Sequence, residues 1–401
     1  MSGEEHPVLE AARELTPRLV EWRRHLHMHP EPSMQEHETA RFVAERLREM
    51  GLEDIREGIG ETGVVAVIWG QGEATVALRA DMDALEMTEE TGAEYASQRE
   101  GMMHACGHDA HTACLLGAAA ILSQRREELP GNVKLIFQPG EEGAGGALRM
   151  IEDGCLQEPQ VAAIAALHVF PELASGQIGL NWGFMTAQSD SVDLAVIGDA
   201  SHAARPHLGT DAISVAAQAV AAIEQFIGRS TDPMHRKVVS FGTISGGTRR
   251  NVLADRVELQ GTIRTYEMDT RERIVDFIGN RLRDLVAAMG ARLQVQIQEG
   301  YPPLWNEEWV LEAIAEAARQ VLGDDAVEEL PYPSLGAEDF AFFQRVGEIP
   351  TAMIRLGTRD EAGGYVWPIH STRFDLNDKQ VLPAGAAVLA QTAVTLLERA
   401  D

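Results

Sequence analysis

One short stretch of the sequence gathers side chains that bind metal ions. From Met103 to His111 it contains one thiol, three imidazoles and one carboxylate. Thiolate and imidazole are preferred ligands of zinc-like ions, and Gly107 between Cys106 and His108 lets the backbone turn tightly around an ion. A buried cysteine beside surface histidines would give the same composition, so the stretch indicates a metal site only if other ligands converge on it.

Other metal-binding side chains follow short aliphatic runs that have the composition of buried strands. These runs, each with the residues after it, are Thr75–Arg79 with Asp81 and Asp83, Val133–Phe137 with Glu141 and Glu142, Val161–Leu167 with His168, and Thr351–Leu356 with His370. Strands and helices alternate here, which predicts an α/β fold with a mostly parallel sheet and helices on both faces. Ligand sites of such sheets lie outside the carboxyl ends of the strands, so we expect these side chains to converge.

The converging groups suit a centre of two metal ions, and its candidate ligands are Cys106, His108, Glu142, His168 and His370. Five ligands exceed what one tetrahedral zinc ion with an open position needs, but they suit two ions that share a bridging group. Such a pair lowers the pKa of a bound water and stabilises the oxygens of a tetrahedral intermediate. The remaining carboxylate, Glu141, is free to act as general base and to deliver a proton to the leaving amine. The pattern therefore predicts a metal-dependent amide hydrolase.

Length and periodicity predict two domains, because 401 residues exceed the usual size of one domain. A catalytic domain would comprise residues 1–185 and 300–401, and residues 186–299 would form a smaller α+β domain inserted into it. Alternating runs at Asp190–Ile197 and Arg256–Thr265 predict antiparallel strands in the insertion. Two amphipathic stretches predict its helices, which gives a β–α–β–β–α–β order of the ferredoxin-like type.

Composition argues against several classes of partner. A net charge of −28 disfavours nucleic acids and anionic membranes, and no apolar run approaches the length of a membrane span. Three cysteines are too few for a disulfide framework and the acidic N-terminus is unlike a signal peptide, so we expect a cytoplasmic protein. Arginine far outnumbers lysine, which a GC-rich genome and adaptation to high salt explain equally well.

Several motifs also occur in order along almost the whole chain. They are R-A-D-M-D-A-L at Arg79–Leu85, M-H-A-C-G-H-D at Met103–Asp109, Q-P-G-E-E at Gln138–Glu142, L-H-V at Leu167–Val169, H-A-A-x-P-H at His202–His207 and G-A-E-D-F at Gly336–Phe340. Together they resemble the metal-dependent amidohydrolase family of hippurate hydrolases, N-acyl-amino-acid amidohydrolases, bacterial carboxypeptidases and plant auxin-amino-acid hydrolases. The resemblance implies a zinc-peptidase-like catalytic domain in which the five candidate ligands hold two metals, Cys106 bridges them and Glu141 is the base.

The resemblance also assigns roles outside the ligand set. The inserted domain would serve as a lid and form a homodimer, with a tetramer as the alternative. His202 would stabilise the oxyanion, often in the partner subunit's active site, and Asn251 would help to hold substrate. Asp83 would join the catalytic residues by contacting a metal ligand. From the residues alone, His202 would be interpreted as a surface histidine and Asp83 as a turn-forming carboxylate.

We therefore predict hydrolysis of N-acyl amino acids, such as N-acetyl or N-benzoyl derivatives, to a carboxylic acid and a free amino acid. A dipeptidase or carboxypeptidase on the same scaffold is the nearest alternative, and a non-catalytic metal-binding or ligand-binding relative is a further one. Thiolate and imidazole favour zinc, although manganese, cobalt and nickel also suit such a site. Three departures from the family pattern bear on the substrate rather than on the metals: Glu86 in place of proline, the stretch Ala187–Ser189 and the loop Asp360–Trp367.

Overall fold

The aliphatic runs form an eight-stranded sheet in the computed structural model, which describes residues 6–400. The strands, in their order across the sheet, are β1 (Ile55–Ile59), β2 (Gly63–Ile68), β4 (Asn132–Gln138), β3 (Thr75–Asp81), β5 (Ala163–Ala174), β14 (Thr351–Arg359), β6 (Ile178–Leu180) and β13 (Val327–Glu329). The neighbours β4, β3, β5 and β14 run parallel, whereas β2 is antiparallel to β4. The predicted α/β fold with a mostly parallel sheet is confirmed. The carboxyl ends of its parallel strands lie side by side along one side of the sheet.

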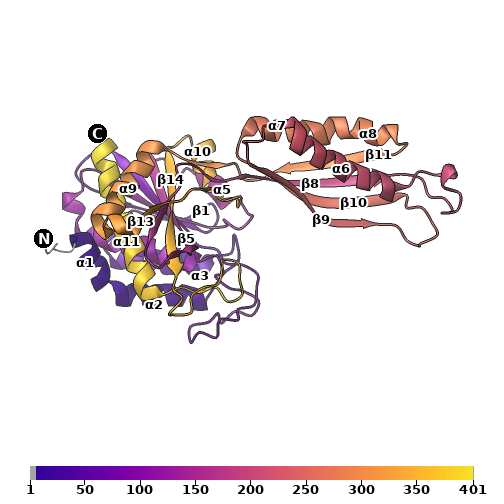
Figure 1. Ribbon diagram of the computed structural model, residues 1–401. Coiled ribbons are helices and arrows are strands. Elements are labelled where there is room, and N and C mark those ends of the chain that lie inside the picture. Colours follow the sequence, from indigo (N-terminus) through magenta and orange to yellow (C-terminus); the bar gives the residue numbers. More distant parts are fainter. Residues whose placement is uncertain (1–5, 401) are drawn as a thin grey trace. The chain divides into compact units, whose positions relative to one another are not determined.

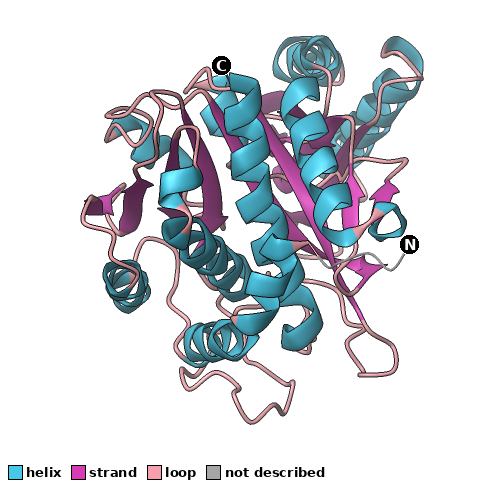
Figure 2. Ribbon diagram, turned by 90° about the vertical axis from the view of Figure 1, so that its left-hand side faces the viewer, coloured by secondary structure: helices cyan, strands magenta, loops and turns pink. Residues whose placement is uncertain are grey.

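Helices cover both faces of this sheet (Figure 2). On one face α4 and α11 contact β3 and β5, with α1, α2, α3 and α9 around them, and α5 and α10 contact β4 and β14 on the other. Their bounds are α1 (Pro7–Glu14), α2 (Thr16–Met28), α3 (His37–Glu49), α4 (His108–Gln124), α5 (Gly146–Glu152), α9 (Glu308–Leu322), α10 (Ala341–Arg345) and α11 (Asp378–Ala400). A Cβ at Gly117 of α4 would lie 2.7 Å from Ala386 and 2.7 Å from Leu19, so glycine permits the close approach of α4 to α11 and α2.

Helix α11 corrects one expectation, since its length and composition would allow it to cross a membrane. We expected no apolar run long enough for this. However, 83% of its most apolar window is buried inside the protein. It packs against α4, α9 and the sheet, so α11 is a core helix, and its apolar character reflects burial on nearly all sides.

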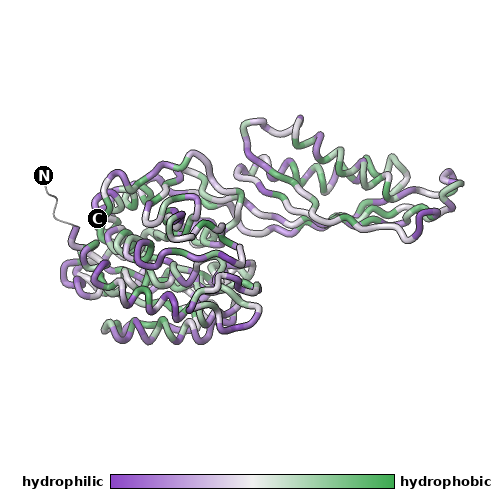
Figure 3. Tube along the Cα trace, turned by 60° about the horizontal axis from the view of Figure 1, so that its bottom comes forward, coloured by the Kyte–Doolittle hydropathy of each residue, from purple (hydrophilic) through white to green (hydrophobic). Residues whose placement is uncertain are grey.

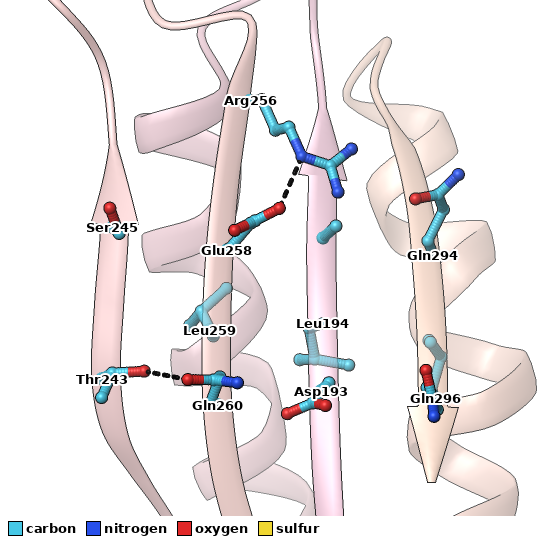
Figure 4. A pocket seen from close by; sticks show the side chains of 12 residues that line it. Asp193, Leu194, Thr243, Ser245, Arg256, Glu258, Leu259, Gln260, Gln294 and Gln296 are labelled. Atoms are coloured by element: carbon cyan, nitrogen blue, oxygen red, sulfur yellow. Dashed lines mark hydrogen bonds and ion pairs between the residues drawn. The ribbon is translucent and has the colours of Figure 1, made fainter.

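The second unit contains a four-stranded antiparallel sheet with helices on one face (Figure 1). Its elements, in chain order, are β8 (Gln188–Ile197), α6 (Ala212–Ser230), β9 (Lys237–Gly246), β10 (Arg256–Thr265), α7 (Met268–Asp276), α8 (Leu282–Ala288) and β11 (Arg292–Glu299). Hydrophobic and hydrophilic residues alternate along its helices (Figure 3), and the hydrophobic ones form a separate core against the sheet. The other sheet face carries polar side chains such as Thr243, Glu258, Gln260 and Gln296 around a shallow hollow (Figure 4).

The chain divides into these units close to the residues named from the sequence. The first runs up to Met185, from Trp305 to Pro333 and from Asp339 onward, and the second comprises Thr186–Leu304 and Ser334–Glu338. The return therefore lies a few residues after position 300. The short strands β7 (Gly183–Thr186) and β12 (Leu304–Asn306) pair with each other where the chain enters and leaves the second unit. The second unit therefore extends to Leu304.

A buried charge network fixes α2 against α4 and α11. Arg23 lies 2.8 Å from Asp109, 2.9 Å from Asp375 and 3.1 Å from Asp378. His27, one helical turn further, lies 2.7 Å from the same Asp109 carboxylate. Arginine suits such a position because its planar guanidinium serves several carboxylates at once.

This network predicts a pH-dependent stability. Burial and Arg23 lower the pKa of His27, but Asp109 and Glu89 outweigh them and raise it to about 9. The stabilisation is complete below pH 6.5 and is lost as the pH rises through 9, at up to about 3 kcal/mol in total. Urea unfolding at pH 6.5 and pH 9.5 should show this decrease in wild type and a smaller one in His27→Gln. Equal decreases in both proteins would contradict the prediction.

Candidate metal centre

The five candidate ligands gather in the first unit as two groups of three. The ligand atoms of Cys106, His108 and His168 lie within 4.8 Å of one another, and so do those of Cys106, Glu142 and His370. Cys106 belongs to both groups: its Sγ lies 3.5 Å from His168 Nε2 and 3.3 Å from His370 Nε2. The distance from His370 Nε2 to Glu142 Oε1 is 3.3 Å. A shared thiol between two trios is the geometry that two ions with a bridging ligand require.

Local backbone features place these side chains. Gly107 has a φ of +85°, and a Cβ there would lie 2.5 Å from Val169, so the turn between Cys106 and α4 requires glycine. His108 is the first residue of α4. His370 also has a positive φ, +61°, and its N–H donates to Ala105 O at 2.8 Å, which ties its loop to that of Cys106.

His168 does not lie at the end of its strand, as the sequence suggested. Strand β5 continues past it to Ala174, because β14 remains paired with β5 through this region. The imidazole still joins the cluster, since its Nδ1–H donates to Val169 O at 2.8 Å and thereby turns Nε2 toward Cys106. Burial and the neighbouring His111 hold the pKa of His168 well below its usual value, so the ring is neutral, as a metal ligand must be.

Unpartnered buried atoms fit the residues to a cation. Among the described residues, neither of the buried atoms His108 Nε2 and Glu142 Oε1 makes a hydrogen bond, although Glu142 Oε1 lies within ion-pair distance of His370 Nε2 at 3.3 Å. Burial raises the pKa of the Cys106 thiol to about 12, so its thiolate forms only with a cation beside it. For His108, burial opposes protonation, but the charge of Asp81 raises its pKa well above the ordinary value. The same negative field would attract a metal ion.

Asp83 lies behind this cluster with its carboxylate fully engaged. It accepts hydrogen bonds from Ser33 Oγ at 2.6 Å and from the backbone N–H groups of Glu141 and Glu142 at 3.1 and 2.9 Å. His108 Nδ1 lies 3.2 Å from Asp83 Oδ1 and 2.9 Å from its carbonyl oxygen, which leaves Nε2 for the cluster. A carboxylate behind a ligand histidine fixes its tautomer and orientation.

Glu141 is buried, and a carboxylate oxygen lies within 4.8 Å of the ligand atoms of His108 and Glu142. His202 and Asn251 instead belong to the second unit. There they are neighbours, since Ala203 N–H donates to Asn251 O at 3.0 Å and His202 bridges to Val252.

His111 and Asp81 form a supporting pair to which the sequence motifs gave no role. His111 Nδ1 lies 2.6 Å from Asp81 Oδ1, and the N–H of Val169 donates to His111 Nε2 at 2.9 Å. His111 therefore holds the backbone next to His168. His111 lies three residues after His108 on the same helix, which places both rings on one side of α4. This spacing is the sequence feature that could have predicted that His111 lies beside the cluster.

Known proteins are similar to this chain over most of its length. A model of the peptidase family M20/M25/M40 matches residues 77–395. An N-acetyl-L-cysteine deacetylase of Bacillus subtilis is 37% identical over 96% of this chain and 89% of its own length. Thermostable carboxypeptidase 1 of Saccharolobus solfataricus is 37% identical over 95% of this chain and 96% of its own. The solved structure of a Bacillus subtilis dinuclear metal-binding peptidase of the M20 family has a TM-score of 0.82, with 33% identity over 96% and 99% of the two chains.

Because Cys106 belongs to both three-residue groups, we predict that replacing it weakens metal binding at both. Cys106→Ala should remove most of the bound divalent metal, because each trio loses its sulfur ligand. Metal content after gel filtration, measured by mass spectrometry, tests this. Cys114→Ala is the matched control, since Cys114 is also buried but its thiol faces Leu382 O at 3.6 Å. Full metal content in Cys106→Ala would contradict the prediction.

Proposed function

Because the chain belongs to the M20/M25/M40 peptidase family, we propose that it hydrolyses N-acyl amino acids to a carboxylic acid and a free amino acid. The chain is a metal-dependent amidohydrolase, as the family and its deacetylase and carboxypeptidase relatives show. The finer assignment is supported by the 37% identity to an N-acetyl-L-cysteine deacetylase. The observation that carries metal-dependent amide hydrolysis is the pair of three-residue groups that share Cys106.

In this proposal His108 and His168 would hold one divalent ion, Glu142 and His370 would hold a second, and Cys106 belongs to both groups. Zinc suits the thiolate and imidazole donors, and manganese, cobalt or nickel can take its place. When bound, the ions lower the pKa of a water molecule and polarise the amide carbonyl.

The chain's own groups perform the proton transfers. Glu141 takes the proton of the attacking water and passes it to the amide nitrogen as the C–N bond breaks. Asp83 keeps Glu141 in place through its backbone N–H. His202 donates to the negative oxygen of the tetrahedral intermediate, and Asn251 binds the substrate.

A carboxypeptidase or dipeptidase is the second candidate, supported by the equal identity to a thermostable carboxypeptidase. A binding protein without catalysis is disfavoured, because Glu141 stands beside the complete ligand set. We place the enzyme in the cytoplasm and propose small amides as its substrates, with neither nucleic acid nor membrane as a partner. The net charge of −28 and three free cysteines support this placement.

We also propose a homodimer through the inserted unit, with a tetramer as the alternative. Strand β9 is the last strand of its sheet, and within the described residues it pairs only with β10. Its second half is exposed, including Ile244 at 64%. An exposed strand edge with an apolar side chain favours pairing with another chain, and a second copy presents the same edge.

Metal content coupled to hydrolysis tests the reaction. We expect chelator-treated protein to be inactive, and re-addition of single metals to restore amine release from N-acetyl and N-benzoyl amino acids at about two ions per chain. Glu141→Gln should retain the metals and lose at least about a hundredfold in turnover. If free dipeptides are cleaved and N-acyl amino acids are not, the second candidate is correct. Metal loss in Glu141→Gln would mean that Glu141 is itself a ligand.

The dimer can be tested at Ile244. Ile244→Lys places a charge at the proposed interface, so the mass measured by light scattering should fall from dimer to monomer at micromolar concentration. Met234→Lys is the control, because Met234 is 84% exposed but lies outside β9. A wild-type monomer, or an Ile244→Lys dimer, would argue against the interface.

A further inference from the structure

The loop that carries His370 is anchored at its start. Asp360 and Tyr365 exchange two backbone hydrogen bonds of 2.9 Å. The Asp360 carboxylate also accepts from Gly363 N–H at 2.9 Å and from Asn377 Nδ2 at 3.0 Å. These contacts give the loop one defined conformation rather than a loose tether.

A second set of contacts anchors the loop beyond His370. The N–H of Glu90 donates to Thr372 O at 2.7 Å, and Thr372 Oγ donates to the Glu90 carboxylate at 2.8 Å. The N–H of His370 is bound to Ala105, next to Cys106. The side chains of this loop are therefore held in a fixed position relative to the metal ligands.

Two large apolar side chains stand exposed on this loop. Val366 is 39% exposed and Trp367 is 42% exposed. The guanidinium of Arg373 lies 5.2 Å from the Trp367 ring centroid, a cation–π contact that fixes the indole and covers part of it. Because Trp367 and Arg373 each lie three residues from His370 and their side chains meet, the segment forms an arc around His370.

The arc brings Trp367 into the neighbourhood of the metal centre. Three residues of chain span at most about 11 Å, and a curved segment spans less. The His370 side chain is 51% exposed, so the centre opens to solvent at this residue. A rigidly held, half-exposed indole at the mouth of a hydrolytic centre has the character of an apolar binding wall.

We propose that Trp367, together with Val366, forms the subsite for the acyl group and makes the enzyme prefer aromatic or long aliphatic acyl groups to acetyl. This rests on the function proposed above. The carbonyl carbon that the activated water attacks belongs to the acyl group, so this group lies next to the ligands and Glu141, in the unit that carries Trp367. An apolar wall stabilises a bound acetyl group less than a bound phenyl ring, because the acetyl group buries less apolar area.

The test compares two substrate series on metal-loaded enzyme. One varies the acyl group on alanine (acetyl, octanoyl, benzoyl), and the other varies the amino acid (alanine, leucine, phenylalanine) on an acetyl group. We expect Trp367→Ala to lower the benzoyl-to-acetyl ratio of kcat/KM by about tenfold to a hundredfold. Trp367→Phe should retain most of the ratio, and Val366→Ser should lower it less than Trp367→Ala does.

Trp69→Ala is the matched control and should leave the ratio unchanged. Trp69 is 51% exposed and follows β2, whose last residue pairs with Val133 at the start of β4. It therefore lies at the amino ends of the parallel strands, away from the carboxyl ends that carry the metal ligands. Metal content shows whether each variant keeps its centre.

An unchanged acyl ratio in both Trp367→Ala and Val366→Ser, with N-acyl amino acids still hydrolysed, would overturn the subsite alone. An effect confined to the amino-acid series would also overturn it, because Trp367 would then contact the other half of the substrate. Wild-type enzyme that hydrolyses no N-acyl amino acid would reject the proposed function and the acyl subsite together.

Discussion

The buried carboxylate of Asp83 is the interaction on which the candidate centre depends. It binds the loop after β4 through two backbone N–H groups and contacts the His108 ring at the start of α4. A carboxylate taken out of water must keep its donors, so these parts cannot move independently without leaving a buried charge unpaired. One side chain thus sets the position of a histidine and of two glutamates.

The cluster around Cys106 is also constrained by charge. Removed from water, the thiol resists ionisation, and His108 Nε2 and Glu142 Oε1 are without hydrogen-bond partners among the described residues. Each of these costs would be relieved by a cation at the same place, which couples metal binding to the stability of the surrounding loops. The pairing of a buried ligand set with the half-exposed His370 also leaves the centre open on one side for a substrate.

In the first unit, the proposals give the metal chemistry and the choice of acyl group to different side chains. The ligands and Glu141 come from β5, the start of α4 and loops beside the sheet, and Trp367 lies on the same loop as the ligand His370, between β14 and α11. Relatives named as deacetylase and carboxypeptidase are equally similar to this chain. A common centre with variable loops accounts for such divergence, because a loop can change its apolar surface without disturbing the ligands.

The sequence by itself determined the fold class and the candidate ligands. Aliphatic runs followed by Asp83, Glu142 or His370 specify strands with polar ends, and the geometry of parallel sheets brings those ends together. Tertiary structure alone decided which ligands form each trio, that His168 lies within β5, and that His111 supports it through Val169. The reason is distance along the chain: His370 meets Cys106 across 264 residues and His111 meets Val169 across 58. Contacts of a few ångströms between such remote side chains arise from the packing of whole elements, which no local pattern of residues encodes.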